Sequence, residues 1–289
     1  MIKVEQMGIF PRITIVMPSF NQAAYLEEAI CSVLDQNYPN LEFMILDGGS
    51  TDGSQEIIER YADHLTCWHS RPDKGQTDAL IQGLERATGD LLGWVNSDDV
   101  LLPRMLSHVA SAYVSNPGVG LLFGDYVLID ERGRIVGCKR VPRKRIGWFA
   151  QKGYWVINSQ GTFFSRHVYD LVGGLNADLC YVMDADLYMR MLINGTRYQH
   201  VGHYLAGFRR HGDAKTVKGL GESRAEHYYA AERYWPPRIA KGRKQRRWQY
   251  VYWAFQIGNG NLIMFLDTLT AQGRHWKEWA ERGAYAGDR

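Results

Sequence analysis

The chain has 289 residues, of which 45% are hydrophobic and 22% are charged, and its formal net charge is +3. These values are typical of a globular protein that buries a sizeable core, and they argue against a disordered chain. No segment approaches the run of about 20 apolar residues that a membrane-spanning helix needs, and residues 1–20 lack a signal-peptide pattern. We therefore expect a cytoplasmic protein, either soluble or peripheral on the inner face of the membrane.

The first hundred residues alternate between strand and helix patterns. Apolar runs rich in β-branched residues predict strands, and apolar residues at helical spacing predict helices. The expected strands are residues 13–17, 41–46, 66–68 and 90–95, and the expected helices are residues 25–36, 55–62 and 76–87. Such alternation predicts a parallel sheet with helices on both of its faces.

From about residue 120 the pattern becomes richer in strands. The expected strands are residues 120–130, 134–136, 160–164 and 204–208, and the expected helices are residues 166–172 and 184–194. The tail from residue 220 onward has a helical, aromatic and basic pattern. No internal repeat is visible in the sequence.

Polar residues interrupt the chain where three of the predicted strands end. These breaks are residues 18–21, 47–54 and 96–99. In open parallel sheets, ligands bind outside the carboxyl ends of the strands, where the loops converge. The sequence therefore predicts a binding crevice at this edge of the sheet.

Asp98 and Asp99, here called the acidic pair, end a predicted strand in the stretch GWVNSDDVLLP. Adjacent carboxylates repel each other and need a cation, a hydrogen-bond network or open water. One interpretation is a solvated turn that caps a helix starting near Pro103, because Asn, Ser and Asp favour such turns. The other is an acidic motif that faces the binding crevice.

Asp47 ends the second predicted strand in LDGGSTDGS, where glycines permit close approach of the backbone to a ligand. A phosphate cradle is disfavoured there, because the GxGxxG pattern is absent and an acidic residue repels phosphate. Asp47 could accept a hydrogen bond from a nucleobase or a ribose. It could equally cap its own turn.

Two stretches, ITIVMPSFNQAAYLEEAICSVLDQNYPNLEFMILDGGSTDGS and RPDKGQTDALIQGLERATGDLLGWVNSDD, resemble the family 2 glycosyltransferases. Members of this family are inverting enzymes that use nucleotide-sugar donors and have the GT-A fold. The resemblance extends, in motif order, over roughly residues 12–212. It implies an α/β fold with a mostly parallel central sheet flanked by helices.

By this resemblance, the acidic pair forms a DxD-type motif that works with Mn²⁺ or Mg²⁺. Asp99 would ligate the cation, and Asp98 would contact the ribose or the metal, since hard cations take carboxylate and phosphate oxygens. Asp47 would read the nucleobase. The resemblance places further residues on the nucleotide side of the pocket: Pro18, Phe20, Asn21, Arg71, Asp73 and Lys74.

The resemblance also supplies a general base. In MDADLYMR, Asp184 at a helix start matches the aspartate that deprotonates the acceptor hydroxyl. Met183 stands where the family usually has Glu, which leaves Asp186 as the alternative base. Both acids could instead be helix N-terminal carboxylates that the helix dipole favours.

His211 matches an RxH segment that follows the core in many relatives. It could ligate the metal or contact the diphosphate, or it could be an ordinary surface histidine. Residues 243–253 concentrate Arg and Lys among aromatic residues. They could lie on an anionic membrane surface, which suits a lipid-linked acceptor, or they could form a packing helix or a homodimer contact. Nucleic-acid binding is not expected, because the basic charge is confined to the tail.

These features predict a GT-A catalytic domain over residues 1–215, with a nucleotide-binding half at 12–100 and an acceptor-binding half at 101–215. Residues 216–289 would form a helical C-terminal extension. The predicted activity is inverting transfer of a sugar from a UDP- or dTDP-linked donor to a hydroxyl of a glycan or glycolipid. The alternatives are a sugar-nucleotidyltransferase, which would need a glycine-rich basic loop after the first strand, and a nucleotide- or glycan-binding protein without catalysis.

Overall fold

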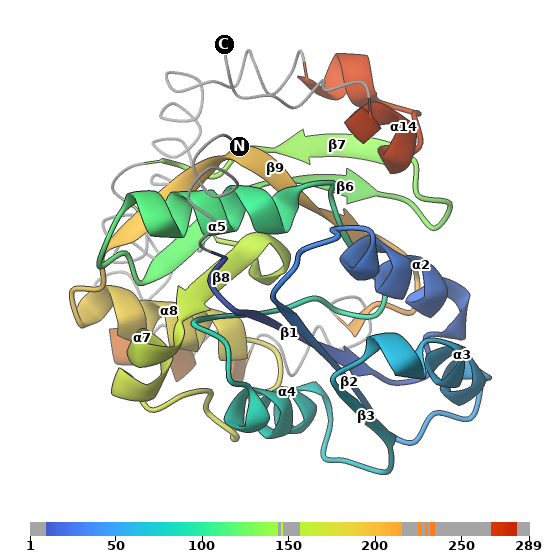
Figure 1. Cartoon of the computed structure of the whole chain (residues 1–289), viewed down its shortest axis with the longest axis horizontal. Helices are drawn as coiled ribbons and strands as arrows, with labels where there is room; N and C mark the ends of the chain where they lie inside the picture. Colours follow the sequence, from blue (N-terminus) through green and yellow to red (C-terminus); the bar gives the residue numbers. More distant parts are fainter. Residues whose placement is uncertain are drawn as a thin grey trace.

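The computed structural model describes residues 10–143, 146, 157–215, 225–226, 229–230, 232–234 and 267–281. Within these residues, nine strands form one sheet, and helices cover both of its faces (Figure 1). The predicted α/β fold class is therefore confirmed. The basic tail segment at residues 243–253 lies outside the described residues.

The first half of the sheet is parallel, in the order β3-β2-β1-β4. All seven elements that the sequence predicts in the first hundred residues are present, with ends shifted by at most two residues. The strands are β1 (Ile13–Ser19), β2 (Leu41–Asp47), β3 (Cys67–Ser70) and β4 (Leu91–Trp94), and the helices are α2 (Ala23–Leu34), α3 (Ser54–Arg60) and α4 (Gln76–Arg86).

The second half of the sheet is mixed. β8 lies antiparallel between β4 and β6, β9 runs parallel to β6, and the two-residue strand β5 pairs antiparallel with β9. The elements are β5 (Val100–Leu101), α5 (Met105–Ser115), β6 (Leu121–Ile129), β7 (Ile135–Lys139), β8 (Thr162–Ser165), α7 (Arg166–Leu171), α8 (Met183–Ile193), β9 (Tyr198–Arg209) and α14 (Trp276–Glu281). The strand predicted at residues 204–208 is the end of the longer β9.

Apolar side chains on the two faces of the sheet form separate clusters. Helices α2, α3 and α5 pack on one face, where Ile30 and Val109 join sheet residues such as Ile15. Helices α4, α7 and α8 pack on the other face, where Leu80 and Leu187 join residues such as Trp94. Burial of these side chains gives the main favourable free energy of folding, so the helices fix the sheet from both sides.

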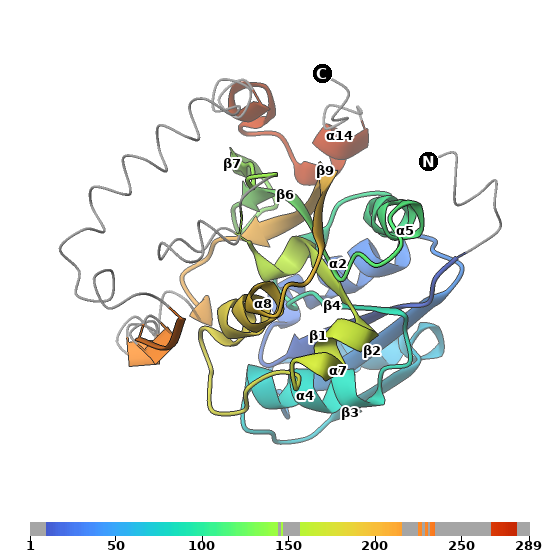
Figure 2. The ribbon, with the colours of Figure 1, turned by 90° about the vertical axis from the view of Figure 1, so that its left-hand side faces the viewer.

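A third cluster attaches helix α14 to the far end of the sheet. Trp276 and Trp279 pack there with Ile129, Ile135 and Tyr204. Figures 1 and 2 both place α14 close to β7 and β9 and far from α4. The described part of the C-terminal region is thus packed on the same sheet as the N-terminal strands.

One glycine in β4 is required by a close contact across the sheet, which provides a test of the fold. A methyl group at Gly93 would meet ring atoms of Phe163 on the paired strand β8 at 2.7 and 2.8 Å. Gly93→Ala should therefore lower the free energy of unfolding by about 1–3 kcal/mol, the usual cost of overpacking. Urea denaturation followed by circular dichroism measures this change.

The matched control is Gly137→Ala in strand β7. The nearest atom to a methyl group there, Leu128 Cδ1, is 3.8 Å away. This variant should be as stable as the wild type or more stable by up to about 1 kcal/mol, because alanine restricts the unfolded chain. Equal stability of the Gly93 variant and the wild type would contradict the strand pairing.

Candidate active site

The acidic pair lies in the turn between β4 and β5. Because β5 pairs with β9, Val100 lies opposite Gly207, and the turn just before Val100 lies beside the segment that follows Gly207. Both acids contact this segment, as described below. The interpretation of the pair as a cap of the following helix is wrong, because β5 lies between them, the N-cap residue of α5 is Arg104, and a first-turn N–H of α5, that of Leu106, donates to Gln36 Oε1 instead.

Asp99 is held inside the protein by three hydrogen bonds. Its Oδ1 accepts from the backbone N–H of Arg209 at 2.8 Å, and its Oδ2 accepts from Gln160 Nε2 at 2.7 Å and from Asn96 Nδ2 at 3.1 Å. Only 1% of the residue is exposed. Burial raises the pKa of Asp99 well above its ordinary value, the charge of Asp98 adds to this rise, and the three donors oppose it.

Asp98 is the more open member of the pair, with 18% of its side chain exposed. Its Oδ2 lies 3.0 Å from Nε2 of His211. An N–H at His211 Nε2 can donate this hydrogen bond to the carboxylate oxygen. Among the described residues, Nδ1 of His211 is buried and has no hydrogen-bond partner.

Carboxylate oxygen and imidazole nitrogen are both ligands of Mn²⁺-like ions, so a divalent cation that replaced the proton between Asp98 Oδ2 and His211 Nε2 would meet two suitable ligand atoms. No group of three or more His, Cys, Asp or Glu side chains that could hold a metal occurs among the described residues. Further ligands would therefore come from the donor or from water. The prediction that Asp99 ligates the cation stays untested; in this structure both of its oxygens face protein donors.

On the side predicted to bind the nucleotide, the ends of three parallel strands are level. Asp47 lies opposite Ser19 of β1 and Ser70 of β3. The Asp47 carboxylate is fully buried and accepts four hydrogen bonds of 2.6–3.1 Å, from the Gly49 N–H, from the N–H and Oγ of Ser50, and from Ser70 Oγ. Oδ2 accepts three of these bonds and Oδ1 accepts one. In this conformation Asp47 caps its own turn, and its contact with a nucleobase remains a prediction.

The first strand presents one exposed aromatic ring at the same edge. Pro18 is buried within β1, whereas 60% of Phe20, just beyond the strand, is exposed. Asn21 adopts a left-handed backbone with φ of 52°. Its Oδ1 accepts from the Thr51 N–H at 2.9 Å, which ties the loop after β1 to the loop after β2. Phe20 thus lies beside the Asp47 loop.

The segment after β3 contributes two cations and one carboxylate. Arg71 and Lys74 are exposed, and Arg71 Nη2 donates to Gln82 at 2.8 Å. Asp73 is half-buried, and a methyl group at Gly48 would lie 3.2 Å from both of its oxygens. Glycine at position 48 therefore lets the Asp73 carboxylate lie against the backbone just after Asp47.

The two acids at the start of α8 have different environments. Asp186 is buried, forms an ion pair with Arg190 at 2.7 Å, and accepts a hydrogen bond from the Tyr234 hydroxyl. Asp184 is half-buried, and its Oδ1 accepts from the N–H of Ala185. The geometry therefore favours Asp184 over Asp186 as the acid that can meet a substrate.

A hydrogen-bond chain connects the loop before α8 to the acidic pair. Lys215 Nζ donates to Cys180 O at 2.6 Å and to Gln76 Oε1 at 2.9 Å, and Gln76 Nε2 donates to Asn96 Oδ1 at 2.7 Å. Asn96 in turn donates to Asp99. The start of α8, the start of α4 and the acidic turn are thus joined at one place.

Sequence reasoning missed several of these polar residues. Gln160 could have been noticed, because NSQG is a polar run directly before an apolar strand. Gln76 and Lys215 gave no comparable signal. Their contacts join positions 139 residues apart, which no local pattern reveals.

None of the described helices has the length and apolar character that crossing a membrane would require.

The candidate site consists of an open carboxylate beside an imidazole, level strand ends with an exposed aromatic ring, and a second acid at a helix start. Such a set can bind a cation with a phosphorylated ligand and can remove a proton from a neighbouring hydroxyl.

Comparison with known proteins assigns the chain to a family. The model of glycosyl transferase family 2 matches residues 14–170, more than half of the chain. An uncharacterized glycosyltransferase of Haemophilus influenzae is 34% identical over 137 residues, covering 46% of this chain and 54% of that protein. A PGL/p-HBAD biosynthesis glycosyltransferase of Mycobacterium bovis is 29% identical over 198 residues, covering 66% of this chain and 75% of that protein. Against five curated relatives the chain spans only 20–54% of their length.

Solved structures give the same fold. S. aureus TarS, crystallised with UDP-GlcNAc, matches with a TM-score of 0.62 and 17% identity over 76% of this chain and 64% of that chain. The mannosyltransferase PcManGT of Pyrobaculum calidifontis, in complex with GDP-Man and Mn²⁺, matches with a TM-score of 0.56 and 20% identity over 78% of this chain and 65% of that chain. The chain has the GT-A fold and belongs to glycosyl transferase family 2.

Proposed function

We propose that this protein is an inverting glycosyltransferase that moves a sugar from a nucleoside diphosphate donor to a hydroxyl of a glycan or glycolipid. The observation that carries the proposal is the open carboxylate of Asp98 beside His211, at the edge of the sheet where the nucleotide-side strands end. Family membership supports the activity. The UDP-GlcNAc and GDP-Man complexes of the fold neighbours support a nucleotide-sugar donor, and the family resemblance around Asp47 favours UDP or dTDP.

For the donor end, we assign the diphosphate to the side of Asp98 and His211. A divalent cation, Mn²⁺ or Mg²⁺, bound there would neutralise the negative charge that develops on the leaving nucleoside diphosphate. The exposed cations Arg71 and Lys74 would add positive charge on the same side. The Mn²⁺ complex of PcManGT supports a metal in this fold.

For the nucleoside, we assign the base to the exposed ring of Phe20, since an aromatic face stacks well on a nucleobase. Asp73, half-buried against Gly48, would accept from the ribose or the base. Asp47 would hold the conformation of the loop through its four hydrogen bonds. It would contact the nucleobase only by giving up one of these bonds.

For the acceptor end, we assign the general base to Asp184. A sugar hydroxyl is a weak nucleophile, so a carboxylate within reach must take its proton while the new glycosidic bond forms. Attack from the face opposite the leaving diphosphate inverts the anomeric centre. Asp186 is a poor base, because Arg190 and Tyr234 already occupy its oxygens.

The acceptor class includes lipid-linked glycans, which a membrane contact of residues 243–253 would suit. That segment lies outside the described residues. The membrane contact and the homodimer remain predictions from the sequence.

The role of Asp98 can be tested through ligand binding. For the wild type, UDP with Mn²⁺ at about a hundred times its Kd should stabilise the fold by about 2.7 kcal/mol. Asp98→Asn should weaken Mn²⁺-dependent UDP binding by at least about tenfold, because a neutral amide is a poorer ligand. Calorimetric titration measures the Kd of UDP with Mn²⁺ for the wild type and for Asp98→Asn. Asp63→Asn, at an exposed position in another part of the fold, is the control, and retained Mn²⁺-dependent binding in Asp98→Asn would remove Asp98 from the metal site.

The two acids of α8 can be separated by paired substitutions. Asp184→Asn should lower UDP release in the presence of a panel of glycan acceptors by about 10²–10⁴-fold, while stability changes by less than about 0.5 kcal/mol. Asp186→Asn should lower the free energy of unfolding by about 1–3 kcal/mol, because Arg190 loses its charged partner. Full activity of Asp184→Asn would exclude it as the base, and a wild type that binds UDP but releases none from any donor would favour a binding protein.

A further inference from the structure

The side chain of Arg209, at the end of β9, is buried behind the acidic pair with 1% exposure. A buried guanidinium must have partners for its donors. Its Nε donates to the backbone carbonyl of Asp98 at 2.8 Å, and its Nη1 donates to the carbonyls of Asp130 and Glu131 at 3.0 and 3.3 Å. Its backbone N–H donates to the Asp99 carboxylate. Arg209 thus contacts both residues of the acidic pair, one through its side chain and one through its backbone.

The charge of Arg209 is balanced by a carboxylate from a helix that packs on the sheet. Glu28 of helix α2 accepts from Arg209 Nη2 at 2.5 Å through its Oε2. The guanidinium also lies 4.9 Å above the ring of Tyr25, one turn earlier on the same helix. The fork of the guanidinium therefore fixes α2, β9 and the acidic turn relative to one another.

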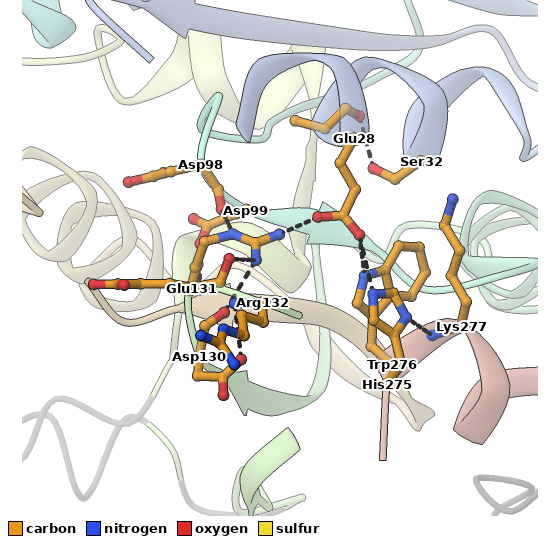
Figure 3. Close-up of polar contacts among 12 residues, drawn as sticks. Glu28, Ser32, Asp98, Asp99, Asp130, Glu131, Arg132, His275, Trp276 and Lys277 are labelled. Atoms are coloured by element: carbon orange, nitrogen blue, oxygen red, sulfur yellow. Dashed lines mark hydrogen bonds and ion pairs between the residues drawn. The ribbon is translucent and has the colours of Figure 1, made fainter. Parts of the chain in front are cut away.

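Glu28 has a second partner from the far end of the chain. Its Oε1 accepts from the indole Nε1 of Trp276 at 2.7 Å, and His275 Nε2 lies 3.7 Å away. Figure 3 shows Glu28 between Trp276 and His275 on one side and the acidic turn with Asp98 and Asp99 on the other.

Trp276 is itself held firmly on the sheet. Its backbone N–H donates to Gly133 O at 3.0 Å, and Ile135 N–H donates to Arg274 O at 2.8 Å. The indole is buried in the same cluster as Ile129 and Ile135. Trp276 is therefore held in place by backbone hydrogen bonds and by burial, and its indole N–H has a defined position relative to Glu28.

We propose that Trp276, Glu28 and Arg209 form one positioning network that sets the acidic pair for metal and nucleotide. Segment 267–281 would then belong to the catalytic unit, although it lies beyond both the family match at residues 14–170 and a domain end at residue 215. The inference rests on the proposed function, because it concerns the same donor site. It adds three residues that touch neither donor nor acceptor.

The network acts through geometry and charge. With Glu28 neutralised, the full charge of Arg209 faces the acidic pair and repels an incoming cation. With the indole N–H removed, Glu28 loses the contact that orients its carboxylate toward Arg209. The guanidinium keeps its carbonyl partners in both cases, so the fold persists while the position of Asp98 becomes less fixed.

Two substitutions with a matched control test the proposal. Glu28→Gln keeps the side-chain shape and Trp276→Phe keeps an aromatic ring but removes the indole N–H and part of the ring volume. Each should raise the Kd of UDP in saturating Mn²⁺ and the apparent Kd of Mn²⁺ by about tenfold, as when a group behind a metal ligand is lost. The double variant should be little worse than either single variant, because both break one chain of contacts. Glu27→Gln is the control, because Glu27 lies on the same helix as Glu28 but forms an exposed ion pair with Arg60 of α3. This substitution should leave both Kd values unchanged.

Calorimetric titration of the full chain, with near-ultraviolet circular dichroism to confirm folding, gives these constants. Weaker metal and UDP binding in folded variants supports the network. Lower melting temperatures with unchanged Kd values would show a purely structural role and overturn it, as would independent, additive effects of the two substitutions. A wild type that binds neither UDP nor any other nucleoside diphosphate with Mn²⁺ would overturn the proposed function itself, whereas wild-type binding with unaffected variants would overturn the network alone.

Discussion

The pairing of the short strand β5 with β9 is the contact on which the site depends. Two adjacent carboxylates at a strand end repel each other, and this pairing places them against Arg209 and His211, which give the two acids different surroundings. Asp99 turns inward and is satisfied by three donors. Asp98 stays open beside an imidazole. One acid thus fixes the turn, and the other is left for a ligand.

The same arrangement explains why distant parts of the chain meet at this edge. The carboxyl ends of the parallel strands supply the Asp47 loop and Phe20, and the loop before α8 is tied to Asn96 through Gln76 and Lys215. Glu28 connects the turn to Trp276 of α14. A site built in this way needs both halves of the sheet, and the contact of Glu28 with Trp276 is the basis for the proposal that segment 267–281 belongs to the catalytic unit.

The parallel half of the fold could be predicted from the sequence, because apolar runs, helical periodicity and glycine-rich turns are local signals. In the mixed half most elements could be predicted as well, but their pairing could not, since the insertion of β8 between β4 and β6 and the two-residue β5 depend on contacts between residues far apart. The same limit applies to the site. The acidic residues in the motifs could be recognised from the sequence. Their partners could not, because only packing shows that Asp186 forms an ion pair with Arg190. Packing also shows that Glu28 faces inward to Arg209, whereas Glu27 pairs with Arg60 on the surface.

In the proposed function, the open carboxylate of the acidic pair holds a divalent cation together with a sugar donor's diphosphate. A crystal of the protein with UDP and Mn²⁺, measured at a wavelength where manganese scatters anomalously, tests it most directly. We expect an anomalous peak at coordination distance from the Asp98 carboxylate, with the diphosphate on its far side and Asp99 still hydrogen-bonded to Gln160 and Arg209. A nucleotide bound with no peak at Asp98, or a peak held by other side chains, would contradict it.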